Sequence, residues 1–343
     1  STKEKGRVTR AAAMALKSRV TLYMASPLFS EDSEDKWKQA AEAAYDIIKQ
    51  KTDLGLDLVP YPQIFNDVNN QKAEVILYRP TGESGDFEKA NFPIGVEGGK
   101  TSTCPTQNLM EAYDMKDGTP FVWNNQSDPY DNRDPRMKYT IVCNEMKWPV
   151  DPVEIWEGGT NGLPLQNATT TGYYLKKYVN NTISFEAGST VTKKQHNWVL
   201  FRYGEILLNY AEAMINAFHD PNYKDAVYNM SAREAVNQIR GRTNISLPGF
   251  PSDITEKDFV KRLKNERRVE LAFEGHRFWD VRRWKELGQT ANIYGVKITK
   301  NNEVISYEKF LLETRAVTDN MYFYPIPNTE RFKNPNLGQN LGW

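Results

Sequence analysis

Apolar and small residues recur at helical spacing in two parts of the chain, and each part predicts a pair of adjacent helices. In the first, residues 8–24 are rich in the strong helix formers Ala, Leu, Met and Lys. This pattern ends at Ser26-Pro27, because the residue before a proline avoids the α region. A second helix is predicted from one apolar face, formed by Trp37, Ala40, Ala41, Ala44, Tyr45 and Ile48. Together they predict a helical hairpin.

A similar unit follows after residue 200. The predicted helix over 203–217 carries an apolar stripe, formed by Ile206, Leu207, Tyr210, Ala211, Met214 and Ala217. A turn is expected over 219–222, and a further helix over about 224–240. Another helix is expected to begin at Thr255, to extend towards Phe273 and to end or bend at Gly275. The pairs are similar to tetratricopeptide repeats, although the strict consensus is absent.

The middle of the chain has a different composition. Residues 59–198 are dense in Pro, Gly, Asn, Asp and Thr, and only short runs over 75–78, 138–142 and 172–175 are typical of strands. Aromatic residues in this segment argue against disorder. We therefore predict a mainly α protein of one compact domain. Its helical scaffold would comprise about 1–58 and 199–343, and an irregular, loop-rich lobe with short strands would comprise about 59–198.

Composition excludes some functions. The 44 basic and 44 acidic residues cancel, so no bulk field favours nucleic acid or an anionic membrane. The 8 Trp, 18 Tyr and 15 Phe suit the apolar faces of sugar rings, although most should fill the core. Cys104 and Cys143 are too few for a disulfide scaffold, and both pairing and two unpaired core thiols remain open. No apolar run approaches the roughly 20 residues of a membrane helix.

Six motifs, in this order, resemble the SusD/RagB family. They are PTQNLMEAYDMKDG (105–118), NRDPRM (132–137), TGYYLKKY (171–178), RYGEILLNYAEA (202–213), ERRVELAFEGHRFWDVRRW (266–284) and a C-terminal set of YPIP (324–327) and NPNLGQNLGW (334–343). Gly204 stands where this family commonly has Ala, and Trp343 where Tyr is usual. The family comprises surface lipoproteins of Bacteroidota that capture nutrients, usually glycans, for an outer-membrane transporter.

This resemblance implies a fold of helical pairs and a non-catalytic function. The chain would capture an extracellular oligosaccharide or polysaccharide and deliver it to a SusC-like, TonB-dependent transporter. The protein would sit on the extracellular face of the outer membrane, held there by an N-terminal lipid anchor. Because Ser1 falls inside the family pattern, just before residues 6–17, we expect the anchor and a helical segment to precede this chain.

The acidic and basic residues of 266–284 could be taken for a catalytic set. Glu266, Glu270 and Arg277 lie near one predicted helical face, and glycosidases use two carboxylates across a cleft. Every acid here, however, has a basic neighbour within one helical turn, which favours a network of arginine–carboxylate pairs. We therefore expect Arg277→Ala to destabilise the fold and not to remove an activity.

Metal and cofactor motifs are weak. His196, His219 and His276 are not at ligand spacing, and the acidic cluster over 128–134 lacks the Gly and distal Glu of a calcium loop. No nucleophile elbow, phosphate-binding loop or dinucleotide fingerprint occurs, so no cofactor is predicted, although a structural calcium elsewhere remains open.

The predicted ligand site rests on lobe aromatics in loop-like surroundings. A tryptophan can cover the C–H face of a sugar while nearby amides and acids bind its hydroxyls. The candidate residues are Trp123, Asn124, Tyr130, Trp148, Trp156 and Tyr173. For each of them the alternative is a buried anchor for its loop. Three other functions remain open: a peptide-binding member of the same family, a glycoside hydrolase, and a helical-repeat interaction protein with no small ligand.

Overall fold

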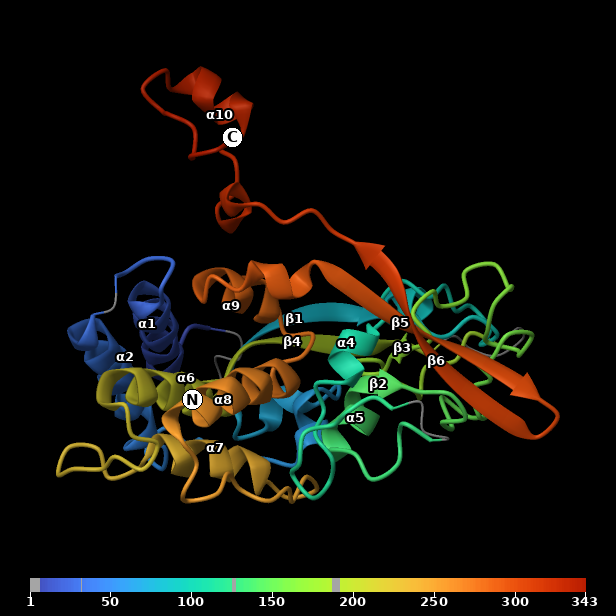
Figure 1. The fold of residues 1–343 in the computed structure, drawn as a ribbon, viewed down its shortest axis with the longest axis horizontal. Helices are drawn as coiled ribbons and strands as arrows, with labels where there is room; N and C mark the ends of the chain where they lie inside the picture. The colour runs from blue at the N-terminus through green and yellow to red at the C-terminus, as the bar shows by residue number, and fades with distance from the viewer. Residues whose placement is uncertain (1–6, 32, 125–127, 187–191) are drawn as a thin grey trace.

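The computed structural model describes residues 7–31, 33–124, 128–186 and 192–343, and the predicted mainly α fold is confirmed (Figure 1). The helices are α1 (Arg10–Ala25), α2 (Glu34–Ile48), α3 (Asp86–Asn91), α4 (Gln107–Met110), α5 (Pro135–Thr140), α6 (Tyr203–Phe218), α7 (Ala232–Arg240), α8 (Glu256–Glu270), α9 (Arg277–Arg283) and α10 (Asn328–Lys333). Short 3-10 turns are η1 (Tyr61–Ile64), η2 (Asn69–Gln71), η3 (Leu287–Thr290) and η4 (Asp319–Tyr322). The strands are β1 (Val75–Ser84), β2 (Ile141–Val142), β3 (Tyr174–Leu175), β4 (Lys194–Arg202), β5 (Asn292–Asn301) and β6 (Val304–Thr314).

Helix α6 is the centre of the scaffold. It is buried on nearly all sides and packs against α1, α2, α7 and α8. Besides the apolar stripe read from its sequence, it buries the polar residues Glu205, Asn209 and Glu212. The predicted hairpin of α1 and α2 is confirmed, with α1 capped by Thr9 and ended at Ser26.

Two predicted helix boundaries are wrong. Residues 224–230 form a loop, because the side chain of Asp225 accepts hydrogen bonds from the amides of Val227 and Tyr228, which holds a turn. Helix α7 therefore begins only at Ala232, behind a capping box of Ser231 and Glu234. Helix α8 is capped by Thr255 as predicted but ends at Glu270, well before Gly275.

The strands form three two-stranded antiparallel sheets, β1–β4, β2–β3 and β5–β6. The run 138–142 is mostly helical, because Pro135 and the capping side chain of Asp134 start α5 there, which leaves only β2 as a strand. The long β5–β6 hairpin lies in the predicted helical scaffold and was not expected. It turns at Asn302, which has a φ of 53°, a conformation that Asn adopts readily.

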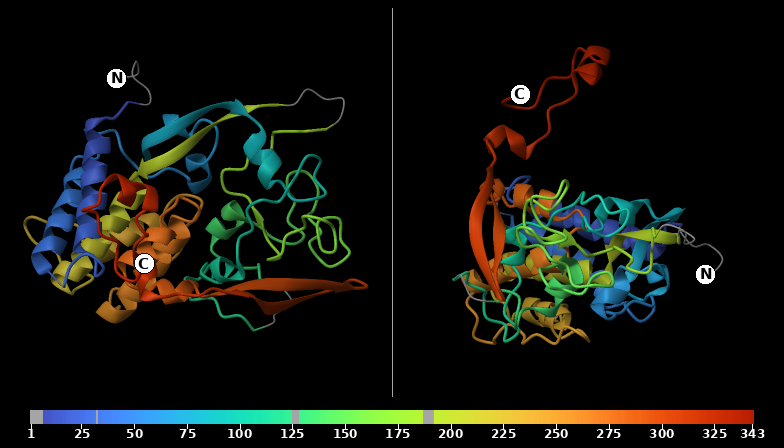
Figure 2. Two further views of the ribbon diagram at one scale, coloured as in Figure 1. Left: turned by 90° about the horizontal axis from the view of Figure 1, so that it is seen from above. Right: turned by 90° about the vertical axis from the view of Figure 1, so that its right-hand side faces the viewer.

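Two main hydrophobic cores lie side by side. One belongs to the helices around α6, and the other fills the lobe between α4, α5, β2, β3 and the inner face of β5. Figure 2 shows the β5–β6 hairpin along one side of the lobe, with the C-terminal segment after β6 extending away from the body. In the described parts of the chain, no helix is long and apolar enough to cross a membrane.

Candidate ligand-binding site

Arginines and carboxylates form a buried charge network where the lobe meets the scaffold. Its members are Asp134 and Arg136 of the lobe, with Glu74, Arg202, Arg240, Arg242, Glu266, Glu270 and Glu274. Glu270 receives hydrogen bonds from Arg202 and Arg136 at 2.8 and 2.9 Å, and Arg242 lies 2.9 Å from it. The predicted arginine–carboxylate pairing is thus present, but its partners come from distant parts of the chain.

Against the effect of burial, the cations of the network lower the pKa of Glu266, Glu270 and Glu274. Burial alone would raise the pKa of Glu274, yet Arg202 and Lys177 lower it to about 2. Burial would also raise the pKa of Glu270. Arg242 and Arg202 outweigh this effect and hold that pKa well below its usual range. A glycosidase needs one carboxyl group that is protonated near neutral pH. Glu266 and Glu270, the pair weighed as catalytic acids, do not meet this requirement.

Arg277 lies outside the network, contrary to our expectation. Its guanidinium donates a hydrogen bond to Oε1 of Gln289 at 2.8 Å, and no carboxylate of the described residues pairs with it. The reason is geometric: α8 ends at Glu270, so α9 begins on a new axis and its first residue faces a surface cavity.

Gly204 leaves room for the network. A Cβ at this position would overlap NH1 of Arg202 and lie 2.9 Å from Oε1 of Glu74. We expect Gly204→Ala to lower the free energy of unfolding by about 1–3 kcal/mol, since the overpacked groups are buried and paired. Chemical denaturation of the variant and the parent chain measures this, and Gly288→Ala, where a Cβ meets nothing within 4 Å, is the control. Equal losses in both variants would contradict the expected steric cause.

Two of the predicted ligand-binding aromatics are core residues. Tyr173 is 0% exposed and its hydroxyl donates to Oε1 of Gln107 at 2.5 Å. Tyr130 is 7% exposed and packs edge-on against both Tyr173 and Tyr307. Tyr173 therefore has no face open to a ligand, whereas Tyr130 lines a separate cavity of about 610 Å³ together with Tyr307.

Trp148 lies at the wall of a cavity of about 480 Å³ between the lobe and the start of β4. Its ring is 6% exposed, Lys176 Nζ lies 4.9 Å from the ring centre, and its indole N–H finds no acceptor among the described residues. Around this cavity, which we call the aromatic cavity, lie Phe65, Asp67, Tyr139, Tyr178, Asn180 and His196. Its aromatic wall and amide-rich rim match the two faces of a sugar.

The remaining predicted residues do not join Trp148. Trp156 is half-buried with Lys300 Nζ 4.3 Å from its ring centre, on the side of the β5–β6 hairpin. Trp123 is half-buried and packs edge-on against Phe121, and Asn124 is exposed. The structure therefore brings no two of the six residues together at one cavity. Tyr139 and Tyr178 line the aromatic cavity beside Trp148 but were not predicted. Tyr139 lies in a helix and Tyr178 in a turn, and neither position carries a sequence signal for ligand binding.

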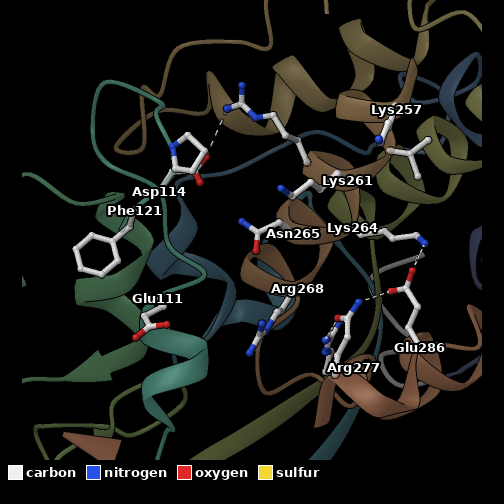
Figure 3. Close-up of a pocket in the computed structure, with 14 residues that line it drawn as sticks. Glu111, Asp114, Phe121, Lys257, Lys261, Lys264, Asn265, Arg268, Arg277 and Glu286 are labelled. Atoms are coloured by element: carbon white, nitrogen blue, oxygen red, sulfur yellow. Dashed lines mark hydrogen bonds and ion pairs between the residues drawn. The ribbon is translucent and has the colours of Figure 1, made fainter. Parts of the chain in front are cut away.

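A second cavity of about 480 Å³ lies between α8, the start of α9 and the loop at Phe121 (Figure 3). We call it the basic cavity, because its lining includes six basic side chains: Lys257, Lys261, Arg262, Lys264, Arg268 and Arg277. The cations on α8 recur at helical spacing in the sequence, which is the signal that could have located this cavity.

Among the described residues, no cluster of three or more His, Cys, Asp or Glu side chains is placed to bind a metal ion. Cys104 and Cys143 are unpaired thiols, and burial raises the pKa of Cys143 to about 12, so it is a packing residue.

Comparison with known proteins identifies the family. The sequence model of the SusD family matches residues 63–343. SusD-like protein P2 of Formosa agariphila is 29% identical over 159 residues, which is 45% of this chain and 27% of that protein. The chain also superposes on a SusD-like protein of Bacteroides fragilis with a TM-score of 0.80 at 27% identity, covering 100% of this chain and 67% of the other. It also superposes on a SusD-like carbohydrate binding protein of the same species with a TM-score of 0.79 at 24% identity. That superposition covers 98% of this chain and 66% of the other.

The curated relative is thus matched over only about a quarter of its length, 27%, while the family pattern extends over most of this chain, from residue 63 to residue 343. On this evidence the chain belongs to the SusD family.

Proposed function

We propose that this chain captures an extracellular oligosaccharide or polysaccharide without chemically altering it. The observation that carries this proposal is membership of the SusD family, supported by a solved relative that is described as a carbohydrate binding protein. By the same reasoning, the captured glycan would pass to a TonB-dependent outer-membrane transporter. The protein would be held on the outer face of that membrane by a lipid anchor.

The aromatic cavity is the proposed glycan site. The half-buried ring of Tyr139 would pack against the C–H face of a sugar, and the ring of Trp148 would extend this aromatic wall. Asp67 and Asn180 at the rim would bind further hydroxyls. We also propose that scaffold and lobe act as one domain, because the buried charge network joins Arg136 of the lobe to Glu266 and Glu270 of α8.

The proposed capture without cleavage has a direct test. The chain is applied to a glycan array, and each bound glycan is then incubated with the protein and examined for shorter products. Binding of one polysaccharide class without products supports capture. Product formation would instead favour a hydrolase, and binding of peptides alone would favour the peptide-binding alternative.

Trp148→Phe should weaken binding of the glycan found in that screen by about 1–3 kcal/mol, because the smaller phenyl ring removes part of the aromatic wall of the cavity. Tyr139→Ala should weaken it by a similar amount through loss of the stacking face. Isothermal titration calorimetry measures both. Trp156→Phe, on the hairpin side, is the matched comparison: if it alone reduces affinity, the ligand lies outside the aromatic cavity.

A further inference from the structure

One face of α8 carries a stripe of cations that the proposed glycan site does not use. Lys257, Lys261, Lys264 and Arg268 follow one another at intervals of four, three and four residues, so they share one face of the helix. The opposite face, with Phe259 and Leu263, packs into the scaffold core. Such a stripe is usually a solvated surface, and the exposed Lys257 and Lys261 fit that interpretation.

The carboxylates of the basic cavity are already paired. Glu286 is bound by Lys264, and Asp114 lies 3.3 Å from Arg240 and 3.6 Å from Arg262. Glu111 lies 2.8 Å from Nζ of Lys309 and also accepts a hydrogen bond from Gln107. Each acid of this cavity therefore has its own cation.

Arg268 and Arg277 are left without a carboxylate partner. Arg268 is half-buried inside the cavity, and its guanidinium makes no hydrogen bond to any described residue, while Arg277 has only the amide oxygen of Gln289. Burial lowers the pKa of Arg268 to about 10, with a smaller contribution in the same direction from the charge of Arg277 and an opposing one from Glu111. Burial also lowers the pKa of Arg277. Two partly desolvated guanidinium groups that face one cavity without a carboxylate partner of their own would be stabilised by a bound anion.

The opposite wall offers a place for a sugar ring. Figure 3 shows Phe121 and Asp114 across the cavity from Arg268 and Asn265, with Arg268 directed into the space between Glu111 and Arg277. Phe121 is half-buried, and its ring is already braced by the guanidinium of Arg133, 3.5 Å from the ring centre. A fixed aromatic ring opposite two guanidinium groups that lack a carboxylate partner fits a ligand that joins an apolar ring face to an oxyanion.

We infer that the basic cavity binds the oxyanion substituent of an acidic saccharide, a carboxylate or a sulfate ester, held by the guanidinium groups of Arg268 and Arg277. This inference rests on the proposed glycan capture and adds the substrate class. A carboxylate is planar and a sulfate ester is tetrahedral, but each presents a pair of terminal oxygens to the donor fork of arginine.

The test compares acidic polysaccharides with their own neutral forms. The chain is titrated with polygalacturonate and carboxyl-reduced polygalacturonate, and with κ-carrageenan and its desulfated form, so that the two pairs separate carboxylate from sulfate. Arg268→Gln is the test variant, and Arg79→Gln is the control, because Arg79 is an exposed arginine on β1 outside both cavities. Thermal melting verifies folding of both variants.

We expect one acidic form to bind at least about tenfold more tightly than its neutral form. Arg268→Gln should abolish this preference without lowering the melting temperature, since it removes an unpaired charge, whereas Arg79→Gln should keep it. Equal binding of acidic and neutral forms would overturn the acidic-ligand inference and leave glycan capture standing. If Arg268→Gln and Arg79→Gln reduce the preference equally, the inference is also overturned, because the preference then reflects the overall charge of the protein and not this cavity. Binding only to an acidic peptide such as polyglutamate, or to no saccharide of either kind, would overturn both proposals.

Discussion

Arg202→Ala should lower the free energy of unfolding by about 3–5 kcal/mol, the largest effect expected of any single change in this protein. Arg202 is 1% exposed and serves three acids: it donates to both oxygens of Glu274 at 2.7 and 2.9 Å, and to Glu74 and Glu270 at 2.8 Å. Removal of the guanidinium leaves these carboxylates buried with fewer cations. Their desolvation is then no longer compensated.

The control for this prediction is Arg277→Ala. Arg277 is an arginine of another family motif, 266–284, but its hydrogen bond is to the amide of Gln289 at 2.8 Å, so its removal should cost under about 1 kcal/mol. Urea unfolding of the two variants and the parent chain measures the difference. Arg202→Lys should recover only part of the loss, because one ammonium cannot replace the bidentate contact with Glu274. If Arg202→Ala and Arg277→Ala lose equal stability, the assignment of the network is wrong.

Acidification from neutral pH to about pH 4 should lower the free energy of unfolding by roughly 3 kcal/mol through His276 alone. His276 is 7% exposed, and burial lowers its folded pKa to about 4 from an ordinary value of 6.5. The carboxylates of Glu205 and Asp280 oppose this shift, while Arg267 and Arg19 reinforce it. Between these two values the unfolded chain binds a proton that the folded chain does not. The contribution of His276 to stability is therefore fully present above the pKa of the unfolded chain, and it is lost as the pH drops towards 4.

Below pH 4 the carboxylates add to the loss. The pKa values of Glu274 and Asp280 are about 2 in the folded protein, where burial would raise them but arginines lower them, so their stabilising contribution disappears as the pH falls towards that value.

Urea unfolding at a series of pH values measures the slope. His276→Gln should flatten it between about pH 6.5 and 4. Identical slopes for the parent and His276→Gln would contradict the role assigned to this histidine.

Local sequence determined most of the helical scaffold. The apolar face of α2, the proline after α1 and the cap at Thr255 act within one or two helical turns, so they predict the helices without knowledge of the fold. The six ordered motifs identified the family for the same reason, because they can be read along the chain. The β5–β6 hairpin was missed, although Asn301-Asn302 between two alternating runs is a turn signal.

Only the tertiary structure decided which charges pair and which rings face a cavity. Sequence neighbours suggested that Arg277 belongs with the acids of α8, whereas Arg136 and Arg202, about 130 and 70 residues away, are the actual partners of Glu270. Tyr173 and Trp148 looked alike as loop aromatics, yet one fills the lobe core and the other borders the aromatic cavity. Burial and ion pairing depend on segments that meet in space, and a single sequence records which residues are present but not which of them meet.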